Sequence, residues 1–307
     1  MHYSVMKEES IKGLNLNDSG IYVDCTLGYA GHSSEILKRM KRGFLFAFDQ
    51  DREAISYSYQ KLKDISENFE IIKSNFKNIK NELLKRNVSE VDGILFDLGV
   101  SSPQLDNKER GFSYHNDAKL DMRMDLDSDF SAYNVVNEYS EKDLKDIIFR
   151  YGEEKYAANI ARNIVRSREE HPIETTLELV EIIKSSMPYK ERMLKHPGKR
   201  TFQAIRMEVN HELEVLEIAL KDALSLLKVG GRMVVITFHS LEDKMVKDIF
   251  KEVTSIDKLV RGLPEIPLEY QPKFKLINNK VIVPSEQELE ENNRSRSSKL
   301  RIIERIR

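Results

Sequence analysis

Short, continuously apolar runs alternate with amphipathic stretches through the first hundred residues, and this alternation constrains the fold more than any other feature. Strands that are apolar along their whole length are buried on both faces, as in a parallel sheet covered by helices. Repeated strand–helix units of this kind build an α/β fold. We expect strands at residues 21–23, 44–48, 70–72 and 93–96, with helices at about 33–41, 51–64 and 77–86.

A fifth strand is expected at residues 232–238, about 135 residues after the fourth. A parallel crossover needs only a dozen residues or more, so a segment is inserted. The pattern is purely helical between Ser140 and Met187, which indicates a helical insertion. One long helix from Phe202 to about Leu227, followed by the turn-forming pair Gly230–Gly231, should return the chain to the sheet.

Beyond the fifth strand the pattern is weaker, because four prolines interrupt residues 252–290. Antiparallel edge strands are plausible at residues 273–277, 280–283 and 300–303.

Composition excludes several classes of protein. No run of 18 apolar residues could span a membrane, and the N-terminus lacks the apolar segment of a secretory signal, so we expect a cytoplasmic chain. Cys25 is the single cysteine and the seven histidines lack metal-ligand spacing, so neither a disulfide within the chain nor a metal site is expected. With 49 Lys+Arg against 51 Asp+Glu, any nucleic-acid site must be local.

Two features after the first two strands predict a nucleoside site. In the segment 24–32, the small residues Gly28, Ala30 and Gly31 let backbone approach a ligand, although glycines there can simply form a turn. Asp49 follows 21 residues after Gly28, the offset of an acid that accepts hydrogen bonds from ribose hydroxyls. The alternative role for Asp49 is the N-cap of the next helix.

The segment Asp97–Gln104 follows the fourth strand and supplies a carboxylate, hydroxyls and an amide. Ligands of open parallel sheets bind beyond the carboxyl ends of the strands, so this segment should lie near the first two features. A capped turn is the structural alternative. Residues 109–114 and 120–125 mix aromatic, basic and acidic side chains without periodicity, as in a loop or lid.

These residues resemble the successive motifs of the bacterial small-subunit ribosomal RNA methyltransferase H family. The resemblance runs in order from His2 almost to the C-terminus. It rests on segments 24–32, 97–104, 110–114, 120–125, 196–204, 238–243 and 294–301.

The resemblance implies a class I, Rossmann-like methyltransferase that uses S-adenosylmethionine, with a mostly parallel sheet, antiparallel C-terminal strands and an inserted all-helical domain. Its product would be N4-methylcytidine in the decoding region of 16S ribosomal RNA. The substrate would be the RNA within a small ribosomal subunit particle or free, no membrane is involved, and a homodimer is left open. The implied domains are 1–106 and 201–307 for the methyltransferase and 107–200 for the loop and the helical substrate-recognition domain.

The resemblance also assigns the cofactor contacts. Ala30 stands where the family has a glycine, so a requirement for positive φ would force this loop to adjust. Cys25 is a smaller departure, interpreted as packing. His32 and Phe76 have core packing as an alternative role. The implied cofactor residues are Gly28, Ala30, Gly31, His32, Asp49, Phe76, Asp97 and Gln104.

For catalysis we expect Asp97, with Ser101 and Ser102, to accept hydrogen bonds from the cytosine amino group. His239, at the end of the fifth strand, is a further candidate. Its environment has a structural alternative, a helix cap formed by Ser240 with Asp243.

Two basic clusters on a nearly neutral chain suggest phosphate contacts, although charge runs are commonly solvated surface. Residues 190–206 and 292–307 each carry six basic side chains against one acidic. The predicted RNA-binding residues are Arg110, Arg123, Lys199, Arg200, Arg294 and Arg296.

Two competing functions remain. A nicotinamide-dependent oxidoreductase shares the glycine loop and the acid, but residues 28–31 lack the G-x-G-x-x-G spacing. A non-catalytic RNA-binding protein that retains the cofactor pocket fits the same motifs.

Overall fold

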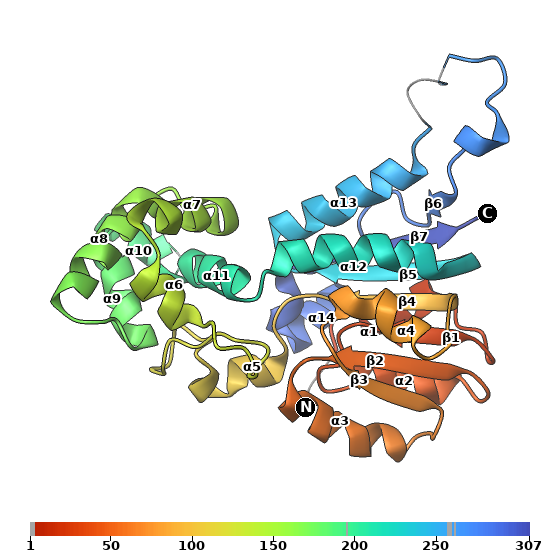
Figure 1. The fold of residues 1–307 in the computed structure, drawn as a ribbon, viewed down its shortest axis with the longest axis horizontal. Coiled ribbons are helices and arrows are strands. Elements are labelled where there is room, and N and C mark those ends of the chain that lie inside the picture. Colours follow the sequence, from red (N-terminus) through yellow and green to blue (C-terminus); the bar gives the residue numbers. More distant parts are fainter. Residues whose placement is uncertain (1–3, 195, 257–259, 261) are drawn as a thin grey trace. The chain divides into compact units, whose positions relative to one another are not determined.

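The computed structural model describes residues 4–194, 196–256, 260 and 262–307. The chain forms two compact units (Figure 1). Unit 1 comprises residues up to Gly99 together with Leu213–Arg307, and unit 2 comprises Val100–Glu212. Within the part of the chain that the structure describes, no helix has both the length and the apolar character needed to cross a bilayer.

Unit 1 is built on a seven-stranded sheet with the order β3-β2-β1-β4-β5-β7-β6. The first five strands are parallel, and β7 pairs antiparallel with both β5 and β6. This confirms the predicted mostly parallel sheet with antiparallel C-terminal strands. The strands are β1 (Ile21–Asp24), β2 (Phe44–Asp49), β3 (Phe69–Lys73), β4 (Val91–Asp97), β5 (Leu227–Thr237), β6 (Phe274–Leu276) and β7 (Lys299–Arg305).

Helices cover both faces of this sheet, which explains the unbroken apolar runs of its strands. Alternate residues enter different clusters: Ile94 and Phe96 pack with α4, α12 and α13, whereas Leu95 packs with α1, α2 and α3. The helices are α1 (Lys7–Leu14), α2 (Gly31–Arg39), α3 (Arg52–Lys63), α4 (Ile79–Leu84), α12 (Glu212–Leu226), α13 (Ser240–Thr254) and α14 (Glu286–Glu291).

The expected single helix from Phe202 to Leu227 is wrong in the structure. The chain forms α11 (Gly198–Val209) and α12, separated at Asn210 and His211. His211 has φ 48°, a left-handed conformation that ends a right-handed helix. The division between the two units follows at Glu212, so the break lies where the chain leaves unit 2.

Two local expectations for the C-terminal half are also corrected. Gly230 and Gly231 lie inside β5, at a register shift opposite residues 91–93, and do not follow a helix. The strand expected at residues 280–283 is reduced to one isolated bridge between Ile282 and Leu300.

Unit 2 is helical around its own apolar core. Ser140 accepts the Asp143 amide and caps α7, and Thr175 with Glu178 forms a capping box at α9, as their spacing predicts. The helices are α5 (Ser102–Asp106), α6 (Ala132–Glu138), α7 (Glu141–Gly152), α8 (Ala157–Glu170), α9 (Thr176–Ser185), α10 (Tyr189–Leu194) and α11.

Candidate active site

The sheet of unit 1 has a switch point between β1 and β4. From these neighbouring strands the chain continues outward in opposite directions, to β2 and β3 on one side and to β5 on the other. Such a point leaves a crevice beyond the carboxyl ends of the strands, where ligands of α/β sheets bind. Asp24 ends β1 and Asp97 ends β4, so two carboxylates lie at this edge.

The loop between β1 and α2 has the backbone shape that its small residues predict. Gly28 has φ 48° and Ala30 has φ 55°, so the position at which the resemblance implies a glycine does lie in the left-handed region. Ala30 occupies it with its methyl group fully buried, and burial of a methyl group offsets part of the strain. A Cβ atom at Gly31 would collide with the Ser4 side chain.

Asp49 ties this loop to the end of β2. One carboxylate oxygen accepts the Gly28 amide at 2.9 Å and the other accepts the Asp51 amide at 2.9 Å. Burial raises the pKa of Asp49 to about 6, although both amide hydrogen bonds oppose the shift. Its alternative role as a helix cap is wrong, because Asp51 caps α3 by accepting the Glu53 amide.

Asp97 combines burial with an unsatisfied oxygen. Its amide donates to the Thr26 hydroxyl at 2.7 Å, which fixes the backbone. Oδ1 is buried and has no hydrogen-bond partner in the described structure. Burial, followed by the nearby carboxylates of Asp24, Glu242 and Glu288, holds the pKa of Asp97 well above its usual range. A buried acceptor of this kind is suited to a donor from a ligand.

His32 and Phe76 each combine packing with a position near these carboxylates. The His32 ring is buried, with Nε2 3.1 Å from the Val5 carbonyl oxygen and Nδ1 3.6 Å from Asp97 Oδ2. Burial lowers the pKa of His32, which favours the neutral ring. Phe76 is half-buried and contacts Phe96 edge-on, with 5.6 Å between ring centroids.

Asp24 lies at the same edge of the sheet, and the sequence interpretation did not single it out. It is almost completely buried, and its carboxylate accepts the Thr26 amide at 3.0 Å and the Ser33 hydroxyl at 2.6 Å. These bonds fix both ends of the loop that contains Gly28. An acidic residue closing an otherwise apolar strand was the available signal, because a carboxylate is rarely buried without partners. Cys25 beside it lies in the apolar core, which confirms its interpretation as packing.

His239 is the N-cap of α13. Its Nδ1 accepts the Glu242 amide at 3.5 Å, and Glu242 accepts the amides of Phe238 and His239. The cap expected from Ser240 with Asp243 therefore lies one residue earlier. Asp243 instead pairs with Lys299 and Arg301 of β7. A catalytic role for His239 stays a prediction, since capping already accounts for the position of the ring.

Unit 2 begins at Val100, three residues after Asp97 in the chain. Ser101 and Gln104 bond reciprocally: the Ser101 amide donates to Gln104 Oε1 at 3.0 Å, and the Gln104 amide donates to the Ser101 hydroxyl at 3.5 Å. This is the capped turn that the sequence left as an alternative, and Gln104 is buried in it. The Ser102 side chain lies outside the described set.

The basic residues predicted to bind RNA in unit 2 differ in solvent exposure and in the contacts that they already make. Arg110 is buried and donates to the Arg123 carbonyl, and Arg123 forms a two-point ion pair with Asp121. Arg200 is exposed and donates to the Glu153 carbonyl at 3.0 Å. Lys199 is exposed beside it. Surface for phosphate is therefore greater at Lys199 and Arg200 than at Arg110.

A group of rings in unit 2 was not anticipated. Tyr114 stacks on His196 with 4.4 Å between ring centroids and 25° between planes, and His115 contacts both rings. His115 is exposed, and His196 precedes the α11 residue Lys199 by three positions. Aromatic rings beside a cation are typical of surfaces that bind single-stranded nucleic acid.

The residues of unit 1 fit S-adenosylmethionine. Asp49 offers a carboxylate for ribose hydroxyls, Phe76 offers a half-exposed ring beside a base, and the unpartnered oxygen of Asp97 suits an ammonium donor or an amino group. The loop from Gly28 to Gly31 brings backbone to the same strand ends.

Known proteins match this chain along its length. The model of the MraW methylase family matches residues 1–306. Ribosomal RNA small subunit methyltransferase H of Exiguobacterium sibiricum is 56% identical over 307 residues, covering all of this chain and 98% of that protein. The protein of the same name from Limosilactobacillus fermentum is 52% identical over 309 residues, with the same coverage. These matches confirm the resemblance drawn from the motifs and exclude the oxidoreductase. The chain belongs to the MraW methylase family.

Proposed function

We propose that this chain transfers the methyl group of S-adenosylmethionine to the N4 amino group of a cytidine in the decoding region of 16S ribosomal RNA, in the cytoplasm. The buried, unpartnered Oδ1 of Asp97 at the end of β4 carries the proposal, because it is an acceptor in search of an N–H donor. The names of the two relatives supply the RNA as substrate.

The cytosine amino group is a poor nucleophile, because its lone pair is delocalised into the ring. When bound, S-adenosylmethionine supplies an electrophilic methyl group on a sulfonium. Asp97 Oδ1 would accept a hydrogen bond from the amino group, which concentrates the lone pair on nitrogen and aims it. Holding the two reactants in line provides much of the acceleration.

The reaction also releases a proton from nitrogen as the N–CH₃ bond forms and the S–CH₃ bond breaks. Asp97 is suited to receive it, because a carboxylate with a raised pKa is a stronger base than an ordinary aspartate. Ser101 is proposed to help orient the amino group, in a position fixed by the turn that it forms with Gln104. No covalent intermediate with the protein is required.

Unit 2 is proposed as the substrate-recognition part of the chain. The rings of Tyr114, His115 and His196 would stack on unpaired bases, and Lys199 with Arg200 would contact phosphate. The target must leave its stack to reach the enzyme, which favours a flexible segment of the RNA.

Transfer of tritium from labelled S-adenosylmethionine tests the function. Wild-type protein should label 16S ribosomal RNA, free or within small-subunit particles, and nuclease digestion should yield N4-methylcytidine. Asp97→Asn keeps the shape of the side chain and should abolish transfer. Retained RNA binding without transfer by wild-type protein would instead identify a non-catalytic binding protein.

A further inference from the structure

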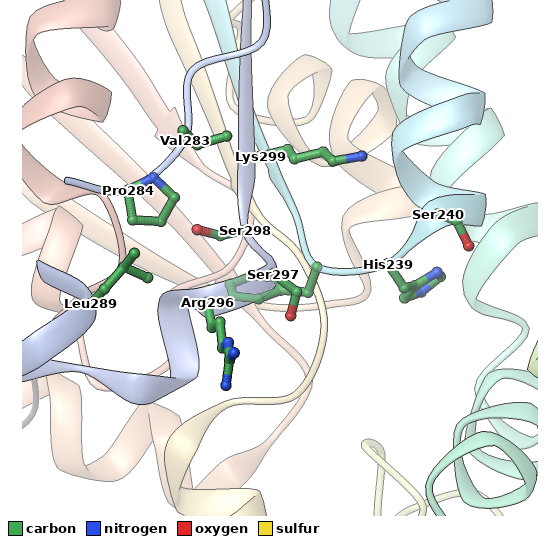
Figure 2. Close-up of a pocket in the computed structure, with 10 residues that line it drawn as sticks. His239, Ser240, Val283, Pro284, Leu289, Arg296, Ser297, Ser298 and Lys299 are labelled. Atoms are coloured by element: carbon green, nitrogen blue, oxygen red, sulfur yellow. The ribbon is translucent and has the colours of Figure 1, made fainter. Parts of the chain in front are cut away.

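A pocket of unit 1 lies where β5 meets α13 (Figure 2). It has a volume of about 460 Å³, within the range of small-molecule sites. Its lining comes from three places in the chain: the turn after β5, the segment before and within α14, and the segment that precedes β7. None of the residues assigned to S-adenosylmethionine lines it, whereas the catalytic candidate His239 does. The lining residues are Phe238, His239, Ser240, Val283, Pro284, Leu289, Arg296, Ser297, Ser298 and Lys299.

One side of the pocket is apolar and open to solvent. Val283, Pro284 and Leu289 lie together on this side, and Arg296 with Ser297 extends along its rim (Figure 2). Val283 is 57% exposed and Leu289 is 39% exposed, so these two side chains are not filling the core, whereas Pro284 is buried. An exposed apolar wall inside a concavity is suited to the flat face of a ligand.

The charge of the pocket is positive, and it depends on Arg296. Lys299 and Arg301 are paired with Asp243, and Arg305 donates to the Leu227 carbonyl. By contrast, Arg296 is exposed and has no hydrogen bond or ion pair among the described residues. No described lining residue is a carboxylate. Fewer basic side chains of the cluster at 292–307 are therefore available to bind phosphate than the sequence indicates. Of those that remain available, Arg296 is the one that lies at the pocket.

The segment that carries Arg296 is held in place by hydrogen bonds of its neighbours in the chain. The Ser295 hydroxyl donates to the Asn292 carbonyl at 2.7 Å, and the buried Ser298 hydroxyl donates to the Ser295 carbonyl at 2.8 Å. The bridge between Ile282 and Leu300 joins the apolar side to the start of β7. Because this segment is already fixed, little conformational entropy is lost when a ligand binds to it.

We infer that this pocket binds one nucleotide of the RNA other than the methylated cytidine, with its base on the apolar wall where Val283 and Leu289 are exposed, and its phosphate on Arg296. Single-stranded RNA combines flat, apolar base faces with a regularly charged backbone, and a guanidinium binds phosphate with paired N–H donors. The inference rests on the proposed function for the identity of the nucleic acid. It adds a second anchoring point that would hold the strand while the target nucleotide is extruded.

Two variants and one control separate this site from general charge effects. Arg296→Ala removes the proposed phosphate contact, and Val283→Asp puts a negative charge on the base-binding wall. Lys247→Ala removes an exposed positive charge from α13 that does not line the pocket. The probe is a protein-free fragment of 16S ribosomal RNA that contains the methylated region, and S-adenosylmethionine affinity reports on folding.

Arg296→Ala should weaken binding of the fragment about three- to tenfold and flatten the slope of log affinity against log salt by about 0.7, the value for one phosphate of a single strand. Arg296→Lys should recover part of the loss. Val283→Asp should weaken binding by a similar factor, whereas Lys247→Ala should not. Photo-crosslinking with 4-thiouridine in the fragment should label a peptide from residues 283–299.

Unchanged fragment affinity for both Arg296→Ala and Val283→Asp would overturn the inference, even if wild-type protein methylates the RNA. Weakening seen only with intact particles would also overturn it, because the partner of the pocket would then be a ribosomal protein. If wild-type protein transfers no methyl group, the proposed function fails, and the crosslink and salt slope still decide whether the pocket binds RNA.

Discussion

The carboxylate of Asp49 accepts the backbone amide of Gly28 at 2.9 Å, so the proposed ribose acceptor also holds the loop that approaches the cofactor. A carboxylate already bonded to two amides keeps further lone pairs for hydroxyl groups. The two functions of Asp49, shaping the loop and binding the ribose, should appear as two effects of one mutation, on stability and on cofactor affinity.

Asp49→Ala should weaken S-adenosylmethionine binding at least tenfold, because hydrogen bonds to a charged group are worth roughly 1.5–3 kcal/mol. It should also lower the free energy of unfolding by about 1–3 kcal/mol, since two amides lose their acceptor. Calorimetric titration and denaturant melts measure the two effects. Asp51→Ala is the control: it loses the cap of α3, at about 1 kcal/mol, and should retain cofactor affinity. Equal affinities for Asp49→Ala and wild type would remove Asp49 from the ribose site.

Cofactor binding should depend on pH through Asp49, whose pKa is raised to about 6. The ionised carboxylate is the stronger acceptor for ribose hydroxyls, so affinity should fall as the pH drops below about 6. Stability has the opposite sign. The folded chain retains this proton between pH 3.8 and about 6 where the unfolded chain has lost it, so the contribution of Asp49 to stability falls as pH rises through that window. Titrations from pH 5 to 8 should show a larger fall in affinity below about pH 6 for wild type than for Asp49→Asn, which keeps only the pH dependence that arises from Asp97.

Binding of S-adenosylmethionine should release a proton from Asp97. Burial and three neighbouring carboxylates hold the pKa of Asp97 well above its usual range, and a bound sulfonium or ammonium cation favours the ionised form. Calorimetry in buffers of different ionisation enthalpy counts the protons released. Asp97→Asn should bind the cofactor with fewer protons released. Proton uptake by the wild type would contradict the assignment.

Ala30 should tolerate glycine and reject a branched residue. Ala30→Gly removes left-handed strain of about 1–2 kcal/mol, but it also loses a buried methyl group worth about 0.8 kcal/mol and makes the unfolded chain more flexible. We expect the free energy of unfolding to change by less than about 1 kcal/mol. Ala30→Val should lower it by more than about 2 kcal/mol, because branched side chains are strongly disfavoured at φ 55°. Thermal melts of both variants, with and without cofactor, measure these changes in stability.

Removing the ring of Tyr114 should weaken RNA binding while sparing the cofactor. Stacking of a base on an aromatic side chain is worth about 1–3 kcal/mol, so Tyr114→Ala should weaken fragment binding about fivefold or more. Phe149→Ala removes a 62% exposed ring from α7 of the same unit and should leave RNA affinity unchanged. Similar affinities for the two variants would make the Tyr114–His196 stack a purely structural contact.

The sequence predicts the strands well and the return helix poorly, and the reason is physical. The apolar runs of β2 and β4 report burial on both faces, which a single sequence records directly. The break at His211 is different, because the apolar spacing from Phe202 continues through it. His211 is left-handed next to the point in the chain where unit 2 ends, and helix propensity does not record such a boundary.

Motif position located the carboxylates of the site, because residues at the ends of neighbouring parallel strands share one edge of the sheet. Motif position could not predict which basic residues are exposed and available for phosphate. Arg110 and Arg296 look equivalent in the sequence, yet one is buried against the Arg123 carbonyl and the other is exposed without a described partner. Which cations are already paired is decided by contacts between residues far apart in the chain.

The ion pairs of β7 have a consequence for how this sheet avoids misassembly. Glu304 pairs with Arg232 directly across the β5–β7 ladder, and Arg301 pairs with Asp243 of α13. A slide of β7 by two residues would keep the same side chains on each face, so hydrophobicity alone discriminates weakly against it. Such a slide would separate both ion pairs and leave two partly buried carboxylates without partners. The cost is on the order of 1–3 kcal/mol for each carboxylate. The charges of β7 therefore favour the observed register over one shifted by two residues.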